Sequence, residues 1–204
     1  MSKIVLLHGF AVHLTAPIVR PAFGPSASMS AFDELVSTGE ARVFPWGIAK
    51  RVKPWQLLNP LLIQQLYQDE YKLIQSLELQ RTLQLFLERE KPSMIVCHSM
   101  GCSLLQNYLE KFTLPSSIKS IVLVQSDLAA TKKLRTNVTL HHLYCPWDPT
   151  LLLSSLVSNH LRAGLCKSKQ AGVNNILFPL TTFPNLHTSS ICDKKLPEFV
   201  TRHL

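Results

Sequence analysis

The sequence lacks any apolar run of the roughly 18 residues needed to cross a bilayer, because His, Pro, Gln or a charged residue interrupts each one. Its first residues resemble a signal peptide, but the apolar run ends at His8-Gly9 and no convincing small-residue cleavage site follows. These absences predict a soluble, cytoplasmic protein with no membrane span.

Cysteines are few and scattered. The five, an odd number, include no C-x-x-C pair. This spacing predicts neither a zinc site nor a disulfide framework. We expect the thiols to be reduced and to pack as small apolar side chains.

Internal repeats, low-complexity tracts and linkers are also absent from the 204 residues. Hydrophobic residues make up 46% and charged residues 17%, which is enough apolar surface for a packed core and excludes a disordered chain. We therefore predict one domain spanning residues 1–204.

Acidic residues are in the minority, 13 against 21 Lys and Arg, so the net charge is +8. A basic chain can bind nucleic acid. However, the only tight basic cluster, Lys132-Lys133-Leu134-Arg135, has no interleaved aromatic residues and no recognisable binding motif. We interpret it as a solvated loop and predict no nucleic-acid partner.

Short apolar runs alternate with longer helical patterns, which is typical of a parallel sheet with crossover helices. The expected strands are Ile4–His8, Ala41–Phe44, Ser93–Cys97, Ser120–Gln125, Val138–Tyr144 and Asn175–Leu180. The expected helices are Leu61–Arg89, Met100–Phe112, Thr150–Leu165 and Leu196–His203, while His13–Ser30, with three prolines, is expected to be a loop. The pattern predicts an α/β fold with about six mostly parallel strands and helices on both faces.

One stretch carries recognisable chemistry: an apolar strand runs into Cys97-His98-Ser99-Met100-Gly101 and then into a helix. It resembles the nucleophile elbow of the α/β-hydrolase family, Gly-x-Ser-x-Gly on a strand-to-helix turn. The turn holds the serine in a strained conformation and requires small residues two positions before and after it. Gly101 meets the second requirement, and the small Cys97 replaces the first glycine.

The resemblance extends to the expected strand ends. Leu6-Leu7-His8-Gly9-Phe10 ends the first strand where the family's oxyanion loop begins, which implies an oxyanion hole from the backbone N–H groups of Phe10 and Met100. His187, between the last strand and the last helix, would be the base. Asp148 would be the acid, and Asp127, after the preceding strand, is the alternative. The order Ser99, Asp148, His187 is the order in the family.

The histidine and the two cysteines near Ser99 are better explained by packing than by catalysis. His98 precedes the nucleophile, and we expect it to pack and hydrogen-bond rather than act as a base, because adjacent strand residues point to opposite faces. Cys97 and Cys102 flank Ser99, but a thiolate nucleophile needs an exposed, electropositive site. Structural packing is the better interpretation for both.

The resemblance implies a serine hydrolase of carboxylic esters that acts through an acyl-serine intermediate and needs no metal or organic cofactor. About a dozen residues separate the expected strands around Ser126–Asn137, so we expect a minimal, cap-less member, similar to esterases and lipases. Its pocket wall would then include Trp46, Trp55, Leu57 and Leu58, and its site would suit short acyl chains. The alternatives are a non-catalytic hydrolase-like binding protein, or an acyltransferase, thioesterase or lactonase that uses the same three residues, Ser99, His187 and Asp148.

Overall fold

The computed structural model describes residues 3–10, 29–47, 59–178, 187, 191 and 193–204. Six strands form one sheet in the order β2-β1-β3-β4-β5-β6, and every neighbouring pair is parallel. Their bounds are β1 Ile4–Leu7, β2 Ala41–Val43, β3 Met94–His98, β4 Ser120–Val124, β5 Thr139–Tyr144 and β6 Val173–Leu177. The α/β class and the six-stranded sheet predicted from the sequence are confirmed.

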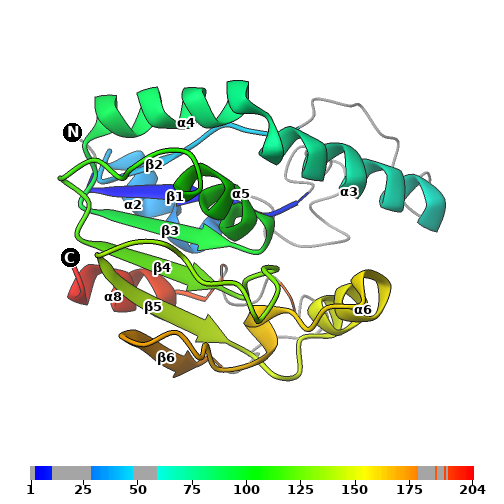
Figure 1. Cartoon of the computed structure of the whole chain (residues 1–204). Helices are drawn as coiled ribbons and strands as arrows, with labels where there is room; N and C mark the ends of the chain where they lie inside the picture. Colours follow the sequence, from blue (N-terminus) through cyan, green and yellow to red (C-terminus); the bar gives the residue numbers. More distant parts are fainter. Residues whose placement is uncertain (1–2, 11–28, 48–58, 179–186, 188–190, 192) are drawn as a thin grey trace.

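Helices lie on both faces of this sheet (Figure 1). Their bounds are η3 Ser30–Phe32, α2 Asp33–Ser37, α3 Pro60–Gln75, α4 Leu77–Glu90, α5 Met100–Leu109, α6 Pro149–Ser158, η5 Ala163–Leu165 and α8 Lys195–Arg202. The α4 and α5 helices cover one face, and η3, α2 and α8 cover the other. Both faces of the central strands β1, β3 and β4 are therefore closed to water, as is typical of a parallel sheet.

The three central strands, β1, β3 and β4, are buried at every position and almost wholly apolar, because both of their faces are covered. Val5 and Ile95 pack in the core beneath α4 and α5, whereas Ile4 and Met94, one position earlier, pack in the core beneath α8. This alternation follows from the two-residue side-chain period of a strand. It explains the continuous Val/Ile/Leu runs in the sequence.

The single helix expected over Leu61–Arg89 is divided in the structure. Ser76 has extended backbone angles (φ −67°, ψ 137°) and separates α3 from α4. Its side-chain oxygen accepts a hydrogen bond from the Leu79 N–H, so it caps the second helix. Periodicity did not reveal this break, because the apolar spacing continues through the capping residue.

The order of the strands places a topological switch between β1 and β3. The chain moves outward from β1 to β2 and then returns to the other side of β1, where β3 begins the run toward β6. In open parallel sheets, ligands bind beyond the carboxyl ends of the strands at such a switch. Ser99 follows β3 at this point, and α3 and α6 extend beyond the same edge (Figure 1).

The structure also shows what lies between β4 and β5. Residues 125–138 are all described and form no helix.

In the described part of the chain, no helix is long and apolar enough to cross a membrane.

Candidate active site

Ser99 occupies a sharp turn between β3 and α5. Its backbone angles are φ 49° and ψ −121°, a region that residues other than glycine rarely adopt. The Ser99 N–H bonds to the Val124 carbonyl at 3.1 Å, and the Ser99 carbonyl accepts the Cys102 N–H at 2.9 Å. These bonds hold the turn from both sides, so the surrounding fold maintains the unfavourable conformation.

Gly101 allows the turn to lie close to β1. A Cβ atom at this position would stand 2.3 Å from the Leu7 carbonyl oxygen and 2.6 Å from that of His8. Gly9 is also tightly enclosed, because its Cβ would lie 3.0 Å from the Ser99 Cβ. Glycine is therefore needed at both positions, and the end of β1 lies directly against the serine.

The side chains of Ser99, His187 and Asp148 form a continuous hydrogen-bonded chain. The distance from the Ser99 Oγ to His187 Nε2 is 2.9 Å, and His187 Nδ1 lies 2.6 Å from Asp148 Oδ2. A carboxylate only accepts, so Nδ1 carries the proton and Nε2 is free to accept the serine hydroxyl. This tautomer can remove a proton from Ser99.

Asp148 stands at the start of α6, directly after the turn that follows β5. Its Oδ1 caps the helix by accepting the N–H groups of Thr150 and Leu151, at 3.0 and 3.1 Å. Burial alone would raise the pKa of Asp148, but the His187 hydrogen bond and charge, the Leu151 N–H and the Gln125 amide together lower it below its usual value. The carboxylate therefore stays ionised against His187.

Gln125 is a site residue that the sequence analysis did not identify. It follows β4, is completely buried, and has a positive φ of 44°. Its Nε2 donates to Asp148 Oδ2 at 2.5 Å, the same oxygen that accepts from His187. Gln125 thereby fixes the carboxylate orientation. Its place at the carboxyl end of the strand next to β5 was the available signal.

His98 lies beside His187 and holds its backbone in place. Its Nε2 is 3.1 Å from the His187 carbonyl oxygen, which can only accept, so His98 donates from Nε2. Burial, with the nearby His187 charge, lowers the pKa of His98 to about 3. The ring is therefore neutral near pH 7 and anchors the backbone of His187.

The alternative acid, Asp127, belongs to a second buried network one helical turn away. Ser103, four residues after Ser99 on α5, donates to Asp127 Oδ1 at 2.5 Å, and Tyr67 approaches Oδ2 at 3.4 Å. Arg162 donates to the Asp127 carbonyl at 2.6 Å. Burial raises the pKa of Asp127, even though Ser103 and Arg162 oppose the rise. The carboxylate that the structure sets against His187 is that of Asp148.

The two cysteines that flank the elbow are packed as small apolar residues. Cys97 is completely buried on β3, and the Cys102 thiol points at the Cys97 carbonyl oxygen at 3.5 Å. Burial, with the Cys102 contact, raises the pKa of Cys97 well above its ordinary value. The thiol form is therefore favoured, and Cys97 lacks the exposed, electropositive surroundings that a thiolate nucleophile needs.

The backbone around Ser99 offers donors for a developing negative charge. Met100 is the first residue of α5, where N–H groups have no carbonyl partner within the helix and the dipole favours an anion. Phe10 follows Gly9 at the end of β1, and its ring packs edge-on against Tyr67, with 5.6 Å between centroids. An oxyanion hole at Phe10 and Met100 stays a prediction that this arrangement permits.

Of the four residues predicted to form the pocket wall, only Trp46 lies in the described part of the chain. It is 3% exposed and stacks flat on His8, with 4.9 Å between ring centroids. It thus supports the end of β1 from the core side. Trp55, Leu57 and Leu58 lie outside the described residues, so their role stays a prediction.

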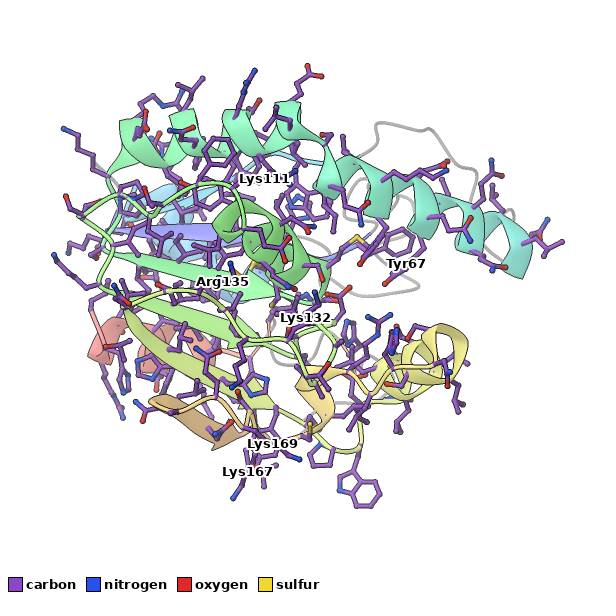
Figure 2. The ribbon with its side chains drawn as sticks, viewed as in Figure 1. Tyr67, Lys111, Lys132, Arg135, Lys167 and Lys169 are labelled. Carbon is purple, nitrogen blue, oxygen red and sulfur yellow. The ribbon has the colours of Figure 1, made fainter. Side chains whose placement is uncertain are left out.

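A separate hollow of about 560 Å³ lies at the far end of α5 from Ser99. It is lined by Gln106, Leu109, Glu110, Thr131, Lys132, Lys133 and Arg135. Figure 2 shows Lys132 and Arg135 on this side of the molecule. The basic cluster of the sequence is exposed here, apart from the buried Leu134. It does not take part in the Ser99 site.

No group of three or more His, Cys, Asp or Glu side chains in the described ranges is arranged to hold a metal ion. Comparison of the chain with protein-family models and with curated proteins found no match.

Proposed function

We propose that this protein is a serine hydrolase of the α/β-hydrolase family that cleaves carboxylic esters. The observation that carries the proposal is the hydrogen-bonded chain from the Ser99 hydroxyl through His187 to the Asp148 carboxylate. Further support comes from the strained turn at Ser99 and from its place at the switch point of the sheet.

In the proposed reaction, Ser99 Oγ attacks the acyl carbon of the ester while His187 Nε2 takes the hydroxyl proton. Asp148 stabilises the imidazolium that forms, and the N–H groups of Phe10 and Met100 hold the oxyanion. His187 then returns the proton to the leaving alcohol. Water hydrolyses the acyl-serine through the same steps, with His187 again acting as the base.

We propose a short acyl group for the substrate and a cytoplasmic location for the enzyme. The segment between β4 and β5 contains no helix that could cover a long chain, and each methylene left in water forgoes roughly 0.8 kcal/mol. The described cysteines, Cys97, Cys102, Cys145 and Cys166, are all free thiols. Such thiols persist in a reducing compartment.

A fluorophosphonate probe tests the mechanism directly, because it modifies only an activated serine. We expect labelling of the wild-type protein and its complete loss in Ser99→Ala. Ser103→Ala is the matched control, since Ser103 lies one turn further along α5 and donates to Asp127 rather than to an imidazole. It should keep the label. A folded wild-type protein that is not labelled would instead be a hydrolase-like binding protein.

A panel of chromogenic esters then tests the substrate class. We expect kcat/KM to be highest at roughly two to six acyl carbons, because longer chains would extend into water. Ser99→Ala and His187→Ala should each reduce the rate by about 10⁴-fold or more, with the double variant hardly worse than either, since triad residues act as a unit. More than a tenth of the activity in Ser99→Ala would exclude the serine mechanism.

A further inference from the structure

The α6 helix presents three of its leucines to solvent and hydroxyl groups to the protein, while Leu151 at its first turn is buried. Leu152, Leu153 and Leu156 are exposed, Leu156 by 80% and Leu153 by 63%. At 100° per residue these three share one face of the helix. The opposite face holds Ser154, whose hydroxyl binds Arg162 Nε at 3.0 Å, and Ser155, whose hydroxyl accepts the Arg162 N–H at 3.1 Å.

Apolar exposure continues on both sides of α6 in the sequence. Trp147, two residues before the helix, is 79% exposed, and Leu161, three residues after it, is 55% exposed. We call Trp147, Leu152, Leu153, Leu156 and Leu161 the α6 patch. Contiguous exposed apolar surface usually marks an interaction site. The patch begins one residue from Asp148, and α6 itself lies beyond the carboxyl ends of the strands (Figure 1).

The sequence around the patch is almost free of negative charge. Residues 128–192 contain six Lys and Arg and a single acidic residue, Asp148, which is completely buried. Two of the cations, Lys167 and Lys169, are exposed and follow η5, which packs against α6 and β5. Figure 2 shows them together on the side of the molecule opposite α4. Neither forms an ion pair with any residue that the structure describes.

We propose that the α6 patch docks this protein on an anionic lipid surface. Three exposed leucines on one face of α6, with exposed Trp147 and Leu161 at its two ends, suit the boundary between headgroups and acyl chains. Exposed lysines follow η5, and residues 128–192 contain no exposed acid. Lysines beside them are attracted to anionic headgroups. A second copy fits less well, because a two-fold contact through the patch would bring the same cationic flanks together. The proposal concerns where the protein binds and does not depend on its catalytic activity.

Co-sedimentation of the full chain with vesicles tests the proposal. Wild-type protein should bind vesicles of phosphatidylcholine with phosphatidylserine, and should bind phosphatidylcholine vesicles at least about 30-fold more weakly, since each lysine near an anionic surface contributes about 1 kcal/mol. The double variant Leu153→Ser, Leu156→Ser should lose about tenfold or more in binding. Leu85→Ser is its matched control, because Leu85 is 67% exposed on α4, away from the patch. It should bind as wild type does.

A charge comparison completes the test. Lys167→Ala with Lys169→Ala should weaken binding to the anionic vesicles about 30-fold, whereas Lys72→Ala with Arg81→Ala, two exposed cations of α3 and α4, should change it little. All the substituted side chains are exposed, so thermal unfolding should stay near wild type in each variant. Absence of vesicle binding by the wild type, or equal loss in both charge variants, would overturn the proposal. So would a dimer in solution that Leu153→Ser with Leu156→Ser dissociates.

Discussion

Replacing Asp148 by Asn separates the two tasks of this side chain. Oδ1 would still cap α6, because an amide oxygen accepts the N–H groups of Thr150 and Leu151 as a carboxylate does. Oδ2 would become an NH₂ group. That group donates, yet it would face two further donors, the Gln125 amide and His187 Nδ1.

The catalytic consequence is a change of tautomer at His187. To pair with the new amide, Nδ1 must give up its proton, which leaves the proton on Nε2 opposite the Ser99 hydroxyl. Nε2 can then no longer act as a base. We expect the rate of ester hydrolysis at pH 7 to fall by about 10⁴-fold.

The stability consequence follows from two hydrogen bonds to a charged oxygen: the Gln125 bond is lost, and the His187 bond is replaced by a weaker bond between neutral groups. Each bond to a charged group contributes about 1.5–3 kcal/mol, so the free energy of unfolding should fall by about 3 kcal/mol at pH 7. The pKa of Asp148 is depressed in the folded state, so its contribution is present above the ordinary pKa of about 4. It is lost as the pH falls through the depressed value. Urea unfolding should therefore show the wild type and the variant converging at strongly acidic pH.

Two further variants control this experiment. Adding Gln125→Glu to Asp148→Asn supplies a carboxylate that can accept from the new amide. This should recover about 1 kcal/mol of stability without recovering activity, since His187 keeps the wrong tautomer. Asp127→Asn removes another buried carboxylate, which contacts Ser103 and Tyr67 rather than His187. It should reduce stability but change the rate only modestly. A large rate loss in Asp127→Asn with little loss in Asp148→Asn would refute the assignment.

Three further predictions follow from the elbow and its surroundings. Ser99→Gly should abolish hydrolysis and raise the free energy of unfolding by about 1 kcal/mol, because glycine adopts the positive φ of 49° without strain. An unchanged or lower stability would show that the turn is not strained. Gly101→Ala should lower the free energy of unfolding by about 3 kcal/mol or more, since its Cβ would meet two backbone carbonyl oxygens. Gly39→Ala is the comparison, because Gly39 has a positive φ of 79° but no atom within 4 Å of its Cβ position. It should lower the free energy of unfolding by about 1 kcal/mol in the same urea titration. His98→Gln keeps a donor for the His187 carbonyl but removes a group whose pKa in the folded protein is about 3. Between pH 7 and 5 only the unfolded histidine takes up a proton, so the free energy of unfolding of the wild type should fall by about 2 kcal/mol more than that of the variant. Equal pH dependence of the two proteins would contradict a buried neutral His98.

Local patterns in the sequence were sufficient for the strands, the elbow and the chain order of the site residues. A strand buried on both faces is a nearly continuous apolar run, so β3 and β4 were visible without a partner strand. The elbow was visible because steric limits around Ser99 act over two residues on either side. The break at Ser76 was missed because one capping hydrogen bond, invisible to periodicity, ends α3 and starts α4.

What only the tertiary structure decided depends on contacts between distant segments. Two aspartates follow neighbouring strands. The resemblance favoured Asp148 and left Asp127 as the alternative. Only packing sets Asp148, with Gln125, against His187 and leaves Asp127 with Ser103. The leucines after Pro149 predicted a helix, but not that its serines would face Arg162 and its leucines water. The sequence by itself determined which elements form, because the steric and hydrophobic rules behind them are local. The orientation of each side chain in the site depended on hydrogen bonds that form only once the sheet is assembled.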